Sequence, residues 1–345
     1  MKAWRWAGSL LVVACSLLCT SCGSEDDVSM QGAGATFPGP LYKRWFLEYY
    51  RKHPAVRVNY QAIGSGAGIR QFNEGLLVFG ASDAFEKPKV AGGGYLIPMT
   101  AGGIAICYNL PDGPTELNLS RDVYVDIFLG KITEWSDPAI AKDNPNVQLP
   151  SIPITVARRS DGSGTTFAFT NHLNAVGKSW RRENGGPGKG KSILWPTGLG
   201  GRGNSGVAAI IQQTPGAIGY LEFGFAELAH ISMAHLQNKA GKFVAATAEN
   251  GLAALGGPNE KKIPEDLHIE ITDPEGDKAY PIVTYTWMLC YRTYADRKVG
   301  DTLKKVLEYC LTDGQDISAE LGYLRLPSRV SEKSLEMVKK IEVGN

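Results

Sequence analysis

The chain has 345 residues, of which 43% are hydrophobic and 41 are glycine, and its formal net charge at pH 7 is +1. This length is typical of about two domains with ordinary packed cores. A net charge so close to zero produces no overall electrostatic field that would attract nucleic acid, and no nucleic-acid-binding motif is present. Nucleic acid is therefore excluded as a partner.

The first residues are typical of an export signal. Residues 1–21 combine a basic start with an apolar stretch that is too short to span a bilayer, which indicates a lipoprotein signal peptide. Small residues then precede Cys22, the residue predicted to carry the lipid, although Cys19 stands where such signals usually have leucine. Residues 22–29 are predicted to form a flexible tether. The alternative is plain secretion with cleavage nearby, and either route exports the protein.

The mature chain repeats one local pattern three times: a strand, a loop of glycine and hydroxyl residues, and a helix. The loops are residues 32–38, 63–68 and 158–166. Backbone N–H groups at the start of a helix have no intrahelical partner, so they form a site for anions, and a nearby arginine adds a two-point grip. One such loop by itself is an ordinary cap or turn more often than a binding site. Three of them favour an anion site in an α/β protein.

The cysteine and histidine residues give little indication of a disulfide framework or of a metal centre. Cys107, Cys290 and Cys310 remain beyond the export segment, and an odd number argues against a disulfide framework. A Cys107–Cys290 bridge stays open as an alternative. The five histidines lack the spacing of metal ligands, so we predict no metal and no cofactor.

In their order along the chain, these loops resemble those of the periplasmic phosphate-binding protein of bacterial phosphate ABC importers. The matching segments are residues 32–38, 63–66, 79–83, 129–135, 158–165 and 203–220. The resemblance implies an α/β fold, the two-lobed type II periplasmic binding protein with a two-strand hinge.

The same resemblance implies where the lobes divide. The hinge strands are expected within residues 100–109 and 280–291. Lobe one is expected to comprise residues 30–104 and 285–345, and lobe two residues 105–284.

The resemblance also implies the site residues. Lobe one is expected to offer phosphate Thr36, Phe37, Ser65 and Asp83. Lobe two is expected to offer Arg159, Ser163, Gly164 and Thr165. Asp161 lies close enough in sequence to orient Arg159, or it is a simple turn residue.

Asp83 is the expected determinant of specificity. A carboxylate in an anion site repels its ligand unless a proton lies between them. Monohydrogen phosphate carries such a proton and sulfate does not, so Asp83 disfavours sulfate. Arsenate is not excluded by this argument.

The implied function is binding of inorganic phosphate by a monomeric, lipid-anchored protein of the cell envelope, which delivers it to the membrane subunits of an ABC permease. A binding protein for sulfate, molybdate or tungstate is an alternative with the same fold. An exported phosphatase or serine hydrolase that uses Ser163 or Ser65 is disfavoured, because neither serine lies in a G-x-S-x-G motif and no triad histidine is recognisable. An adhesive surface protein is disfavoured, because the chain has neither repeated domains nor long aromatic runs.

Overall fold

The computed structural model of the protein describes residues 27–256 and 263–344. The predicted signal peptide, Cys22 and most of the predicted tether therefore lie outside the described residues. Within the described ranges, no helix is both long and apolar enough to cross a bilayer.

Among the described residues, nine strands form one sheet with the order β2-β1-β3-β12-β4-β8-β6-β7, and β9 pairs with β4. These strands are β1 (Val28–Gly34), β2 (Val56–Ala62), β3 (Phe79–Ser82), β4 (Gly94–Tyr108), β6 (Thr155–Arg159), β7 (Leu199–Gly201), β8 (Ala217–Glu222), β9 (Ser232–Met233) and β12 (Val283–Tyr291). Two small sheets contain β5 (Asn118–Leu119), β10 (His235–Gln237) and β11 (Phe243–Val244), and β13 (Thr293–Tyr294) and β14 (Glu342–Val343).

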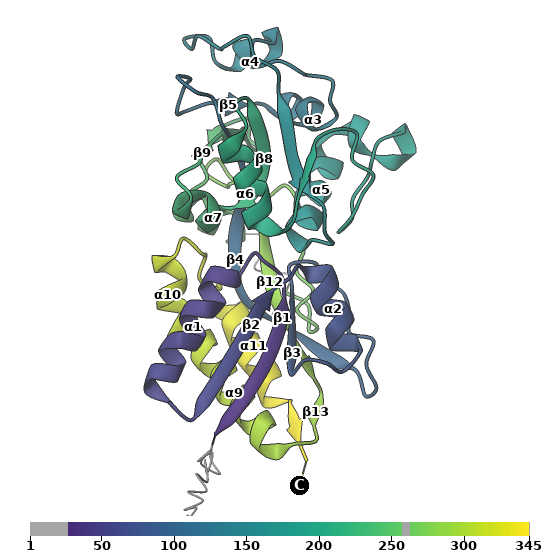
Figure 1. Cartoon of the computed structure of the whole chain (residues 1–345), viewed down its shortest axis with the longest axis vertical. Coiled ribbons are helices and arrows are strands. Elements are labelled where there is room, and N and C mark those ends of the chain that lie inside the picture. Colours follow the sequence, from purple (N-terminus) through teal and green to yellow (C-terminus); the bar gives the residue numbers. More distant parts are fainter. Residues whose placement is uncertain (1–26, 257–262, 345) are drawn as a thin grey trace, which may run out of the picture.

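The helices divide between the two ends of this sheet (Figure 1). Those beside β1–β3 are α1 (Gly39–Lys52), α2 (Ser65–Asn73), α9 (Arg297–Leu311), α10 (Gly314–Glu320) and α11 (Ser328–Lys339). The others are α3 (Arg121–Phe128), α4 (Pro138–Asp143), α5 (Gly164–Val176), α6 (Gly203–Gln213), α7 (Phe223–Leu228) and α8 (Ala248–Leu255), with short 3-10 turns at Lys178–Trp180 and Arg182–Asn184.

Strand β4 changes partners about two-thirds of the way along its length. Its residues 94–103 pair antiparallel with β12, and its residues 104–108 pair antiparallel with β8. β4 therefore belongs to two lobes: lobe one contains β1, β2, β3 and β12, and lobe two contains β6, β7 and β8. Figure 1 shows the lobes stacked end to end, with β4 and β12 between them. This is the two-lobed α/β arrangement predicted from the sequence.

The three glycine-hydroxyl loops lead into helices, as predicted, but two of these helices start earlier than their apolar pattern suggested. α2 begins at Ser65 and α5 at Gly164. The Ser163 side chain accepts a hydrogen bond from the Thr166 amide, which caps α5. Gly64, before α2, has a φ of 96°, a conformation that glycine adopts readily. The loop residues thus form the first helical turns themselves.

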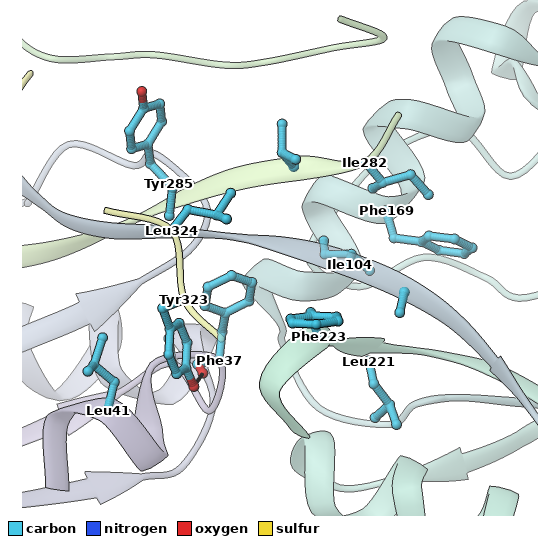
Figure 2. Packing of buried hydrophobic residues seen from close by; sticks show 14 of the residues in the cluster. Phe37, Leu41, Ile104, Phe169, Leu221, Phe223, Ile282, Tyr285, Tyr323 and Leu324 are labelled. Carbon is cyan, nitrogen blue, oxygen red and sulfur yellow. Dashed lines mark hydrogen bonds between the residues drawn. The ribbon is translucent and has the colours of Figure 1, made fainter. Parts of the chain in front are cut away.

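Buried aromatic side chains surround the passage of β4 between the lobes (Figure 2). The Tyr323 hydroxyl donates to the Phe37 carbonyl at 2.7 Å, and the two rings meet edge to face. A Cβ on Gly102 of β4 would lie 2.8 Å from the Phe37 ring, so this strand needs glycine there. The Phe37 side chain is therefore part of the core, and it fixes the backbone of its loop.

The segment 263–271 returns from lobe two to lobe one. The Trp287 indole donates to the Leu267 carbonyl at 3.1 Å, and the His268 ring stacks on Phe85 with centroids 4.0 Å apart. Cys107, Cys290 and Cys310 are buried and unpaired, so the Cys107–Cys290 bridge left open by the sequence is not formed.

Candidate functional site

The residues from the two lobes that were expected to bind the ligand meet between the lobes. The Ser65 hydroxyl accepts from the Gly164 amide at 3.1 Å and from the Asp83 amide at 3.4 Å. A Cβ on Gly164 would lie 2.6 Å from the Asp83 Cβ, so the start of α5 packs directly on this aspartate. The polar side chains of the site are all buried: Thr36, Ser65, Asp83, Arg159, Ser163 and Thr165.

Lobe one supplies its part of the site from the ends of neighbouring strands. β1 and β3 are parallel, with Gly34 opposite Ala81, so their carboxyl ends lie at one edge of the sheet. Thr36 and Phe37 follow β1, and Asp83 follows β3 directly. Ser65 joins them because α2 packs closely on β1, where a Cβ on Gly68 would lie 2.3 Å from the Gly34 Cα.

Lobe two supplies a fixed positive charge. Arg159 is the last residue of β6, and its guanidinium donates to both carboxylate oxygens of Asp161, at 2.8 and 2.6 Å. Asp161 also accepts from the Gly203 amide at 3.0 Å. Burial would raise the pKa of Asp161, but the hydrogen bonds and charge of Arg159 outweigh it and lower the pKa below its usual value. Arg159 is thus held in place by a charged partner, with its side chain almost fully buried.

Asp83 lies in a setting that favours a shared proton. Burial raises the pKa of its carboxyl from the usual 3.8 to about 7, although a hydrogen bond from Thr286 and the charge of Arg159 oppose that shift. Thr286 Oγ1 donates to Asp83 Oδ1 at 2.8 Å. Thr165 also faces this carboxyl and lowers its pKa, but its hydroxyl makes no hydrogen bond of normal geometry. The site therefore combines neutral donors, one guanidinium and a carboxyl that can carry a proton near neutral pH.

The lobes touch around the site. The Gly66 amide donates to the Gly162 carbonyl at 2.9 Å, and the Asn204 amide donates to Thr36 Oγ1 at 3.3 Å. Farther out, Lys191 of lobe two forms an ion pair with Glu86 of lobe one. These contacts hold the lobes in a closed arrangement, in which both lobes enclose one small polar site.

The comparisons with known proteins agree with this architecture. The family model described as the PBP superfamily domain matches residues 22–313. Phosphate-binding protein PstS of Pasteurella multocida is 39% identical over 308 residues, which cover 88% of this chain and 88% of that protein. The chain belongs to the PstS family of phosphate-binding proteins. The family resemblance stated from the loops is therefore confirmed.

Further relatives extend the comparison. The PstS protein of Methanocaldococcus jannaschii is 36% identical over 342 residues, covering 91% of this chain and 87% of that protein. A solved phosphate-binding protein from Stenotrophomonas maltophilia superposes with a TM-score of 0.69 at 19% identity, over 90% of this chain and 94% of that one. At that identity the likeness concerns the fold alone, and it confirms the predicted two-lobed type II fold.

Three residues of the site were not predicted. Thr286 bonds to Asp83, Asn204 lies between Arg159 and Thr36, and Glu222 is buried at the hinge with its pKa raised by burial to about 8. A sequence pattern could have identified Asn204, because this residue lies in Gly203-Asn204-Ser205-Gly206, another glycine-hydroxyl stretch at the start of a helix. No sequence pattern marks Thr286 or Glu222, since both lie within apolar strands. Only the pairing of the strands in the structure shows which groups they face.

Proposed function

We propose that this protein binds monohydrogen phosphate between its lobes and passes it to an ABC permease in the membrane. The observation that carries the proposal is the convergence of Arg159, two helix starts and the buried Asp83 carboxyl on one site. An anion needs the donors and the guanidinium, and the carboxyl suits only an anion with a proton to share. The names of the relatives support phosphate in particular.

In this proposal the ligand is held by Thr36, Phe37 through its amide, Ser65 and Asp83 from lobe one, and by Arg159, Ser163, Gly164 and Thr165 from lobe two. Residues 30–104 and 285–345 are expected to move as one lobe and residues 105–284 as the other, with β4 and β12 as the hinge. Within the second range, the segment 263–271 packs on Phe85 and Trp287 and should move with lobe one. The bound anion bridges both lobes, so it stabilises the closed state.

The cellular setting is part of the same proposal. A lipid on Cys22 keeps a monomeric protein at the outer face of a membrane of the cell envelope, where the permease subunits can receive the closed form. The export signal predicted at residues 1–21 and the tether predicted after it support this placement.

Catalysis is not proposed. The hydroxyls of Ser65 and Ser163 accept hydrogen bonds from backbone amides. His172 bonds to the Tyr124 hydroxyl, and burial lowers its pKa to about 3, so this residue is not placed as a base for either serine.

Calorimetric titration of the mature protein, freed of bound phosphate, tests the proposal with phosphate and then sulfate. We expect one phosphate per chain with a Kd of ~1 μM or lower, about −8 kcal/mol, and no heat from sulfate at pH 8. Binding of sulfate or molybdate in preference to phosphate would assign another oxyanion. Molybdate is titrated last, and binding of none of the three anions would refute an oxyanion site.

A further inference from the structure

Helix α6 begins at the boundary between the two lobes. The amide of its first residue, Gly203, donates to Asp161 at 3.0 Å, and the amide of its second residue, Asn204, donates to Thr36 at 3.3 Å. Gly203 has a φ of 69°, which turns the chain sharply into the helix. The start of α6 thus contacts the partner of Arg159 in lobe two and a residue expected to bind the ligand in lobe one.

The side chain of Asn204 is fully buried and only half satisfied. Its Oδ1 accepts a hydrogen bond from Arg159 Nη1 at 3.4 Å. Its Nδ2 is buried and has no hydrogen-bonding partner among the residues that the structure describes. A buried donor without a partner is costly, so such a group calls for an acceptor that binds there.

Thr165 shares this condition. It is the second residue of α5, as Asn204 is of α6, and its buried Oγ1 likewise makes no hydrogen bond of normal geometry within residues 27–256 and 263–344. Thr165 is one of the residues expected to hold the ligand, and it faces Asp83. Two helix starts of lobe two therefore each bring one unsatisfied donor to the same cleft.

We propose that Asn204 is a ligand residue, whose Nδ2 donates to an oxygen of the bound oxyanion while its Oδ1 positions the Arg159 guanidinium. This inference rests on the proposed function. It adds a neutral donor next to the only arginine expected at the site, so the anion gains a hydrogen bond without added charge. It also couples binding to closure, because the same residue contacts Thr36 across the cleft.

The first test is the affinity of two neighbouring variants for inorganic phosphate, measured by calorimetry beside the wild type. Asn204→Ala should bind phosphate about 10- to 100-fold more weakly, the usual effect of losing a hydrogen bond to a charged group. Ser205→Ala is the matched control, because Ser205 is exposed in the same helical turn, and it should bind within twofold of the wild type. The unfolding temperature of each ligand-free variant separates loss of binding from loss of folding.

Asn204→Asp isolates the Nδ2 group, since the carboxylate keeps the acceptor for Arg159 and replaces only the donor. The ligand role predicts weaker phosphate binding than in the wild type, with partial recovery at a pH low enough to protonate the introduced carboxylate. If Asn204→Ala does not fold, this variant decides the question. Unchanged affinity in the variant that folds would overturn the inference while leaving the proposed function intact.

A crystal structure of the wild type with phosphate supplies the direct measurement. A phosphate oxygen should lie about 2.7–3.2 Å from Asn204 Nδ2. A separation beyond about 3.5 Å, with phosphate bound elsewhere in the cleft, would refute the ligand role of Asn204. Failure of the wild type to bind phosphate at all would instead refute the proposed function, and the inference with it.

Discussion

Replacing Asp83 by asparagine tests the source of anion specificity. The amide oxygen can still accept from Thr286, whose hydroxyl lies 2.8 Å from Asp83 Oδ1. The amide nitrogen then offers the ligand a donor where the ionised carboxylate offers an acceptor. Asp83→Asn should therefore weaken phosphate binding by about 10- to 100-fold at pH 8, the effect of losing one charge-assisted hydrogen bond of about 1.5–3 kcal/mol. It should also make sulfate binding measurable.

The wild type supplies a second, pH-dependent form of the same test. With a pKa of about 7 in the folded protein, Asp83 is protonated in about a tenth of molecules at pH 8 and about nine-tenths at pH 6. Sulfate needs the protonated form, so its affinity for the wild type should rise about tenfold between pH 8 and pH 6 and then level off. Asp83→Asn should bind sulfate with little dependence on pH. Sulfate is the better probe because phosphate itself titrates in this range.

Calorimetry with sulfate at pH 6, 7 and 8 provides the measurement, and Glu222→Gln is the control. Glu222 is the other buried carboxyl that titrates nearby, with a pKa of about 8. Its replacement should leave the rise in sulfate affinity centred near pH 7. A sulfate affinity that is flat with pH in the wild type would refute the proton-sharing argument. So would an Asp83→Asn variant that still binds phosphate as the wild type does and still rejects sulfate.

Three further expectations follow from the contacts between the lobes. Gly164→Ala should weaken phosphate binding by about 10- to 100-fold without lowering the ligand-free unfolding temperature, because the added Cβ would lie 2.6 Å from the Asp83 Cβ only when the lobes meet. A calorimetric affinity equal to that of the wild type would contradict this contact between the closed lobes. Lys191→Ala removes the ion pair with Glu86, in which the Lys191 and Glu86 side chains are 27% and 34% exposed. Stopped-flow measurements should therefore show phosphate dissociating up to about fivefold faster at low salt, with a smaller difference at high salt. Burial raises the pKa of Glu222 from 4.5 to about 8, so its contribution to ligand-free stability is complete below pH 4.5 and is lost as the pH rises through 8. Between pH 4 and pH 9, the free energy of unfolding measured in urea should therefore fall by up to about 5 kcal/mol less for Glu222→Gln than for the wild type, and an equal fall in both proteins would contradict the raised pKa.

The sequence was most informative where chemistry and local structure coincide. Glycine and hydroxyl residues before an apolar helical pattern predicted that helices follow these loops, and α2 and α5 do follow them, although both begin inside the loops at Ser65 and Gly164. The expectation that Asp161 orients Arg159 agrees with the two-point ion pair that the structure shows. Both cases depend on short sequence separations, where backbone geometry alone brings the groups together.

Long-range partners were harder to predict. Thr286 meets Asp83 only because β12 pairs with β3 and β4 in one register, and nothing in the apolar pattern of β12 specifies that register. Glu222 looks from the sequence like an ordinary strand end, yet it caps α7 inside the hinge by accepting from the Gly224 and Phe225 amides. In both cases the decisive fact is which strand lies next to which, and that depends on the whole sheet.

Under the proposed function, division of the site between two lobes links affinity to specificity. The Gly164 amide and the Ser65 hydroxyl belong to different lobes and meet in this closed arrangement. An anion that cannot share a proton with Asp83 leaves an ionised carboxylate in the closed, buried site, where charge is most costly. We therefore expect such an anion to be rejected by a penalty on closure as well as by a lost hydrogen bond. The difference between phosphate and sulfate should therefore be largest for the closed state, so variants that hinder closure, such as Gly164→Ala, should lose selectivity together with affinity.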